Sequence, residues 1–427
     1  MILILPGLAC QIPATIAKNS PQPGVTTAPT ASPLPLSTSQ QPAPTSAPQP
    51  SSSPAVPAAY QALYATLQDE LNSAETRWPA TPGGQPPLYA AELLVADDNR
   101  GPVLLNQGTM PSVRLYLDRL QAMGIKSVKN AIQYPLLTPN FPDYARYLDF
   151  YRQVGQEIHQ RGMVWVIQAS ILFANTPFSP VTYNYSGLTF DAFMQQYRQM
   201  VVTIINELKP DYLTLIGEPD TAAHLTGLAE LNRPDQEVRL INYVLGGLDR
   251  GNTAIGSGTG TWSPLQFVQG MATQTSLDFI SLHFYPMDKR FQSSADQMAE
   301  IAQQNGKYIL ITEAWLYKTD QPGGGQNVAA APEIYKRDAY SFWTPLDEQF
   351  IRVMDSYSRK YNVKILSFFW SNLFFGSIEY DPGMDNQPFQ TIQKQVNQAA
   401  TANLLKGQYS PLGDYYKLWI NGQKPAP

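Results

Sequence analysis

From position 88 onward, short apolar runs alternate with longer amphipathic stretches. Each run is rich in β-branched, aromatic and aliphatic residues, a pattern that predicts buried parallel strands. The predicted strands span 88–95, 127–132, 164–170, 212–216, 254–257, 279–284, 308–311 and 365–369. Between most of them, and after the last, apolar residues recur three and four positions apart. This spacing predicts helices at 112–123, 142–161, 189–208, 235–248, 264–275, 293–304, 346–361 and 388–405.

Strand and helix alternate eight times over about 320 residues, which is the pattern of a (β/α)8 barrel. A doubly wound open sheet would show a similar alternation. However, the chain has no G-x-G-x-x-G after its first strand and no G-x-x-x-x-G-K-[ST], which disfavours the nucleotide-binding sheets. A further amphipathic helix at 59–76 is expected on the outside of the domain, covering the bottom of the barrel.

The first part of the 427-residue chain differs in composition from the rest. No Asp, Glu, Lys or Arg occurs between Asn19 and Gln68, and eleven prolines fall between Pro21 and Pro57. Such a segment cannot bury enough apolar surface to fold, so it predicts an extended disordered tether. We therefore divide the chain into a leader (1–19), a Pro-rich linker (20–58) and a barrel domain (59–427).

Cys10 is the single cysteine, so no intrachain disulfide can form. It ends the apolar run MILILPGLAC, which resembles a bacterial lipoprotein signal, although the run is short and lacks basic residues before it. We expect an exported protein, secreted or held at the cell surface by a lipid on Cys10. The mild net charge of −5 without a basic patch argues against a nucleic-acid partner. We expect a monomer.

Two glutamates carry the candidate chemistry. Glu218 follows the fourth strand in DYLTLIGEPD, and Glu313 ends the seventh strand in KYILITEAWL. The carboxyl ends of barrel strands form the face where active sites are built. Strict alternation along each strand predicts that Glu313 shares the direction of Ile309 and Ile311, and both glutamates are expected to point into the barrel mouth. Two carboxyls on one such face are what glycoside hydrolysis requires.

The order of several short motifs resembles clan A of the glycoside hydrolases, which are retaining enzymes on (β/α)8 barrels. The motifs are Glu-Pro after strand four, His-Phe-Tyr ending strand six, Thr-Glu after strand seven and Phe-Phe-Trp ending strand eight. The resemblance implies that Glu218 is the acid/base and Glu313 the nucleophile. It further implies that Tyr285 donates its hydroxyl to Glu313, that His283 lines the floor of the sugar site and that Trp370 forms a platform beneath the sugar. A galactanase-like branch is the weakly preferred one.

The chain departs from this clan at the residue before the acid/base. Clan members usually have an asparagine there, which binds the sugar's 2-hydroxyl, whereas this chain has Gly217. The arginine often found early in the barrel is also absent, and Lys129 is the nearest cation. Asn130, Gln133 and Gln168, near the ends of strands two and three, are polar candidates for sugar contacts. Trp315 and the insertion 317–344 are expected to line the cleft beside Glu313.

Two rival functions follow from the same residues. Because Gly217 replaces the expected asparagine, the protein could be a carbohydrate-binding lipoprotein on a barrel that has lost catalysis. Alternatively, the two glutamates could be ligands in a metal-dependent barrel hydrolase. We expect no cofactor and no metal, because His159, His224 and His283 are scattered along the chain and no ligand cluster is visible in the sequence.

Overall fold

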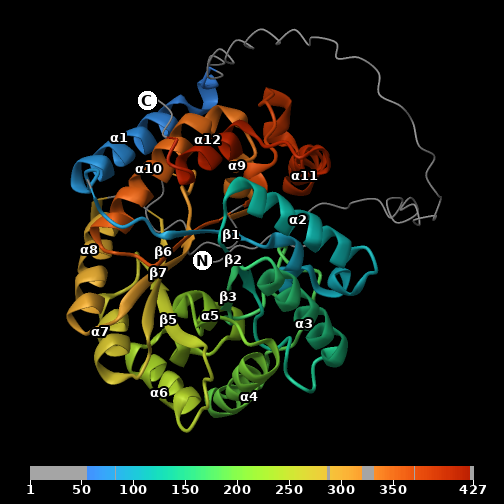
Figure 1. The fold of residues 1–427 in the computed structure, drawn as a ribbon, viewed down its shortest axis with the longest axis vertical. Coiled ribbons are helices and arrows are strands. Elements are labelled where there is room, and N and C mark those ends of the chain that lie inside the picture. Colours follow the sequence, from blue (N-terminus) through green and yellow to red (C-terminus); the bar gives the residue numbers. More distant parts are fainter. Residues whose placement is uncertain (1–54, 82, 286–288, 320–330, 370, 424–427) are drawn as a thin grey trace, which may run out of the picture.

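The computed structural model describes residues 55–81, 83–285, 289–319, 331–369 and 371–423 (Figure 1). Several sequence-based predictions fall outside these residues: the leader with Cys10, most of the Pro-rich linker, Trp370 and part of the insertion at 317–344. Within the described residues, no helix combines the length and apolar character needed to cross a membrane.

Eight parallel strands close into a barrel in sequence order, because β8 pairs with β1 (Figure 1). This closure confirms the predicted (β/α)8 barrel and excludes the open sheet. All eight predicted strands exist, with ends that differ by a few residues. They are β1 (Leu88–Glu92), β2 (Ser127–Ala131), β3 (Val164–Gln168), β4 (Tyr212–Thr214), β5 (Ala254–Gly260), β6 (Phe279–Phe284), β7 (Tyr308–Ala314) and β8 (Ile365–Phe368).

Helices form a ring around the strands (Figure 1). They are α1 (Gln61–Arg77), α2 (Thr109–Met123), α3 (Tyr144–Gln160), α4 (Phe190–Thr203), α5 (Pro219–Thr226), α6 (Pro234–Leu245), α7 (Leu265–Gln274), α8 (Lys289–Gln304), α9 (Ala331–Asp338), α10 (Thr344–Lys360), α11 (Phe389–Lys406) and α12 (Pro411–Ile420). The short α5 begins directly after Glu218 and lies inside the outer ring in Figure 1.

Helix α1 lies in the outer ring and packs against α10 and α8, so the expectation that it covers the bottom of the barrel is wrong. Trp78, which follows the helix, is fully buried, and its indole N–H donates to Asp296 at 2.7 Å. Arg77 forms an ion pair with the same carboxylate at 2.5 Å. The amphipathic pattern of this helix therefore reflects burial against its neighbours in the ring.

Three apolar clusters of buried side chains lie in the described part of the chain, and two of them pack against the body of the barrel strands. The larger one fills the space between the strands and the helices and includes Leu213, Ile309 and Ile311. The smaller one fills the inside of the barrel, where the rings of Phe279 and Tyr308 lie 5.6 Å apart and nearly parallel. Side chains of alternate strand residues thus pack in opposite directions.

Candidate active site

Three titratable side chains meet at the carboxyl ends of β4, β6 and β7. The Nδ1 atom of His283 lies 2.8 Å from Oε1 of Glu218 and 3.8 Å from Oε2 of Glu313. One oxygen from each glutamate and one ring nitrogen of His283 lie within 4.8 Å of one another. All three side chains are fully buried. The fold therefore brings together a group that the sequence scatters over nearly one hundred positions.

Side chains do not alternate strictly along β7, so the prediction that Glu313 shares the direction of Ile309 and Ile311 is wrong. Ile309 and Ile311 pack in the core between the strands and the helices, whereas Glu313 faces the inside of the barrel. The pairing shows how this happens, since Leu282 pairs with Ile311 but His283 pairs with Glu313. Thr312 is thus an extra residue on β7, and such a bulge reverses the face of the residues that follow it.

Glu218 directly precedes α5, and a residue of this helix also holds its carboxyl group. The hydroxyl of Thr221, in the first turn of this helix, donates to Oε2 of Glu218 at 2.7 Å. Pro219 opens the helix at a position where a missing N–H costs nothing. The pKa of Glu218 lies below its ordinary value: complete burial acts to raise it, but the lowering effects, which include the hydrogen bond and charge of His283, are larger.

Glu313 has a different set of partners. The hydroxyl of Tyr285 donates to its Oε1, as the sequence predicted. The ammonium of Lys129 lies 3.8 Å from Oε2 and also pairs with Glu92 at the end of β1. Burial lowers the pKa of Lys129, but the charges of Glu92 and Glu313 outweigh this effect and raise it. Lys129 is therefore a buried cation that stabilises negative charge on Glu313.

Sequence reasoning missed Glu92 and gave Lys129 too little weight. Both are charged residues in strands that otherwise carry no charge, and both are almost fully buried. Charged groups are rarely buried without a partner. A charged residue in each of two consecutive buried strands was therefore a usable signal for an ion pair.

The space next to Gly217 is already filled by other side chains. A Cβ atom at this position would lie 2.8 Å from Nε2 of Gln168 and 3.0 Å from Cε1 and Nε2 of His283. Gln168 ends β3 and, like Val166 two residues before it, points into the barrel. The structure thus brings Gln168 to the site.

Asn130 does not reach the site. It lies on the opposite face of β2 from Lys129, and its side-chain oxygen accepts a hydrogen bond from the indole of Trp165. Trp165 belongs to the core between strands and helices and contacts Gly155 of α3. Asn130 therefore ties β2 to β3 on the outer face of the barrel.

Aromatic rings surround Tyr285 on several sides. Trp262 and Tyr317 stack on it, with ring centroids at 4.8 Å and 5.7 Å and interplanar angles of 22° and 9°. Trp315 meets Tyr285 edge-on, and its indole N–H donates to Asp338 at 2.9 Å. Trp315 is 3% exposed and packs behind Tyr285, where it fixes the position of the tyrosine hydroxyl.

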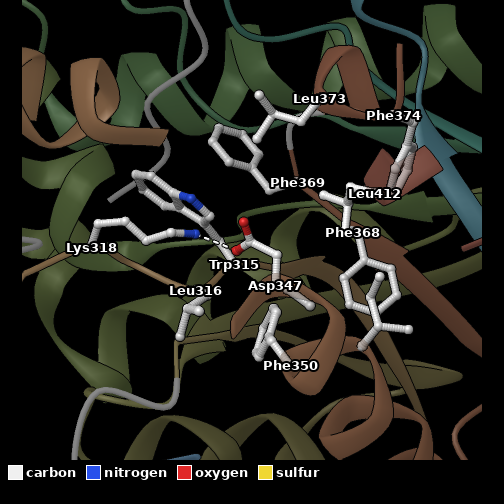
Figure 2. A pocket seen from close by; sticks show the side chains of 12 residues that line it. Trp315, Leu316, Lys318, Asp347, Phe350, Phe368, Phe369, Leu373, Phe374 and Leu412 are labelled. Carbon is white, nitrogen blue, oxygen red and sulfur yellow. Dashed lines mark hydrogen bonds and ion pairs between the residues drawn. The ribbon is translucent and has the colours of Figure 1, made fainter. Parts of the chain in front are cut away.

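A small cavity of about 30 Å³ lies behind Trp315, between the ends of β7 and β8 and helices α10 and α12. Figure 2 shows its mostly apolar wall and the ion pair between Lys318 and Asp347 at one side. Glu218, His283 and Glu313 do not line this cavity, so it is separate from the three titratable side chains.

Comparison with known proteins supports the architecture. No family model matches the sequence, and no curated protein sequence matches it. Among solved structures, an exo-β-1,4-mannosidase from Opitutaceae bacterium strain TAV5 matches 81% of this chain with 14% identity and a TM-score of 0.50. This chain spans 61% of the mannosidase's length.

Two endo-1,4-β-mannanases are also similar to this chain. The enzyme from Rhizomucor miehei matches 76% of this chain and 97% of its own, with 13% identity and a TM-score of 0.41. The enzyme from Thermotoga petrophila RKU-1 matches 74% of this chain and 99% of its own, with 11% identity and a TM-score of 0.42. At these identities, the likeness to the mannosidase shows a shared fold, which is the barrel that the sequence predicted.

Beneath β4, Glu237 of α6 forms a buried hydrogen-bonded chain with the strand that carries Glu218. Its Oε1 lies 2.9 Å from the hydroxyl of Ser257, and that hydroxyl lies 3.1 Å from the carbonyl of Ile216. Burial raises the pKa of Glu237 to about 8, although the hydrogen bond from Ser257 opposes the shift. A protonated Glu237 can donate to Ser257 while Ser257 donates to Ile216, so the neutral acid satisfies the chain.

Glu237 predicts a pH-dependent stability. Its folded pKa is raised above the ordinary value of 4.5, so the folded state binds the proton more tightly. The resulting stability is complete below pH 4.5 and is lost as the pH rises to about 8, by up to about 1.4 kcal/mol per pH unit. We expect the free energy of unfolding of wild type to fall relative to that of Glu237→Gln over this range, measured in urea. If the free energies of unfolding of wild type and Glu237→Gln changed with pH in parallel, Glu237 would be ionised in the folded protein.

Proposed function

We propose that the protein is a retaining β-glycosidase in which Glu218 is the acid/base and Glu313 the nucleophile. The observation that carries this proposal is the pair of buried carboxylates at the ends of β4 and β7, with oxygens within 4.8 Å of each other. Retaining enzymes hold their two carboxyls about 5–5.5 Å apart, whereas inverting enzymes leave about 6.5–9.5 Å for a water molecule. The spacing favours direct attack by a carboxylate.

In the first step, the protonated Glu218 donates its proton to the glycosidic oxygen as the bond to the anomeric carbon breaks. Glu313 attacks that carbon and forms a covalent glycosyl ester. In the second step, Glu218 removes a proton from water, the water oxygen attacks the anomeric carbon, and Glu313 leaves as a carboxylate. The proton taken from water restores the acid form of Glu218.

The two glutamates have surroundings suited to these different tasks. Glu313 has the Tyr285 hydroxyl and the Lys129 ammonium beside it, and both stabilise the negative charge that a nucleophile needs. Glu218 instead contacts the ring of His283 and the hydroxyl of Thr221, groups that can exchange or share a proton with its carboxyl.

Isosteric amides test the two assignments. We expect Glu218→Gln to lower kcat by about 10²- to 10⁴-fold on substrates with poor leaving groups, because proton donation is lost. Glu313→Gln should lower it on the order of 10⁴-fold or more, because the covalent step is lost. Hydrolysis of 4-nitrophenyl β-glycosides and of β-linked oligosaccharides measures both.

Glu237→Gln is the matched control, since it changes a buried glutamate that lies outside the barrel mouth. It should retain most of the activity. Full hydrolysis by either Glu218→Gln or Glu313→Gln would contradict the proposal. A glycan that binds to wild type, while no preparation hydrolyses it, would instead favour the carbohydrate-binding alternative.

The stereochemistry of the first product tests the mechanism separately. Two displacements at the anomeric carbon restore its configuration, so a β-glycoside should release the β-anomer first. Proton NMR of the anomeric signals, recorded within the first minutes of hydrolysis, distinguishes the two anomers before they equilibrate. Initial release of the α-anomer would rule out Glu313 as the nucleophile.

A metal-dependent hydrolase is the second candidate, because Glu218, His283 and Glu313 could together hold an ion. The Lys129 ammonium 3.8 Å from Glu313 disfavours a second cation at this place. We expect hydrolysis to survive prolonged treatment with EDTA, measured with the same 4-nitrophenyl glycosides. Activity that is lost on chelation and returns with added zinc or manganese would favour the metal mechanism.

The proposed substrate is a β-linked oligo- or polysaccharide. The galactanase-like branch, the monomeric state, export and the lipid on Cys10 stay predictions from the sequence.

A further inference from the structure

Gln168 is buried in the barrel mouth with no partner for its side chain. Its exposed fraction is 0%, and neither its amide oxygen nor its amide nitrogen forms a hydrogen bond in the structure. Buried amides in folded proteins are almost always hydrogen-bonded, and the exceptions call for an explanation. Gln168 is thus a group that a packed core would not retain for stability alone.

Other buried glutamines in the described part of the chain are better satisfied. The side-chain oxygen of Gln133 accepts from Asn99 at 3.1 Å, and the side-chain nitrogen of Gln349 donates to Asn72 at 3.0 Å. The side-chain nitrogen of Gln292 donates to the backbone carbonyl of Glu70 at 3.1 Å. Within the described residues, Gln168 is the one buried glutamine whose whole amide is enclosed without a partner.

The Gln168 amide points to the place where the side chain of residue 217 would be. A Cβ on Gly217 would meet Nε2 of Gln168 at 2.8 Å and Nε2 of His283 at 3.0 Å. That His283 nitrogen is also buried without a partner. The backbone of Gly217 is not in the left-handed region, so space, and not backbone conformation, is the reason for glycine here.

We propose that Gln168, which occupies the space beside Gly217, binds the substrate hydroxyl next to the anomeric carbon, the 2-hydroxyl. This inference rests on the proposed glycosidase function. A primary amide offers both a donor and an acceptor, as a hydroxyl does, so the two groups can satisfy each other. The side chain lies beside His283, which itself contacts Glu218, so a group bound there is next to the reacting carbon.

A contact at the 2-hydroxyl contributes to rate, because hydrogen bonds to this group strengthen as the transition state forms. The Gln168 amide is buried and already positioned, so little reorganisation is needed when substrate enters. Gln168 of β3 would therefore bind the substrate. A side chain at position 217, directly before the acid/base, could not take this role, because its Cβ would collide with Gln168 and His283.

The experiment compares two substrates with two variants. The substrates are whichever of the 4-nitrophenyl β-D-glucoside, β-D-mannoside and β-D-galactoside wild type hydrolyses fastest, and its 2-deoxy derivative. Gln168→Met keeps the length of the side chain and removes the amide. Gln133→Ala is the matched control, since it removes another buried amide near the same end of the barrel that has a protein partner.

We expect Gln168→Met to lower kcat/KM for the parent glycoside by about 100-fold and for the 2-deoxy derivative by less than about threefold. Gln133→Ala should change both substrates by the same factor. Gln168→Met should also unfold at a higher urea concentration than wild type, because an unpartnered amide has been replaced by an apolar side chain. A residue with a merely structural role would affect both substrates alike.

Two outcomes would overturn the inference, and they are distinguishable. If wild type hydrolyses the parent glycoside and Gln168→Met loses the same factor on both substrates, Gln168 does not bind the 2-hydroxyl and the glycosidase function stands. If wild type hydrolyses none of the three glycosides and no β-linked oligosaccharide, the proposed function fails and the inference fails with it.

Discussion

The candidate site depends on the compensation of charge inside a closed barrel. Lys129 of β2 pairs with Glu92 of β1 and lies 3.8 Å from Glu313 of β7, and each of the three is almost fully buried. An isolated charge in such a place would be strongly destabilising, whereas a paired one is tolerated. Lys129 therefore supplies the positive charge beside the two buried carboxyl groups. His283 and Tyr285 then connect this ion pair to Glu218 and to the aromatic wall.

The fold could be predicted from the sequence because each element carries its own signal. Apolar runs marked all eight strands, and their regular alternation with helices left few topologies. The helix α1 shows the limit of this reasoning. Its apolar stripe correctly indicated an amphipathic helix with one buried face. The stripe does not indicate which elements cover that face, and the tertiary structure shows that they are α8 and α10.

The two glutamates could be found from their place after β4 and β7, but the direction of Glu313 could not. Alternation puts Glu313 on the side of Ile311, and the bulge at Thr312 reverses that side. A bulge depends on the pairing of β7 with both neighbours, which no local pattern in the sequence records. Asn130 was placed at the site only because it lies near the end of β2. Side chains alternate along a strand, so Asn130 points away from the face that carries Lys129 and contacts Trp165.

Gly217 shows why a missing side chain need not mean a missing function. From the sequence, glycine before Glu218 indicates a lost contact. In the structure, Gln168 and His283 fill that space from β3 and β6, and an added Cβ would collide with both. Side chains from neighbouring strands converge on one point at the mouth of a barrel, so a contact can be supplied from any of them. What a barrel site requires is a group at a position in space, and the strand that supplies it can differ.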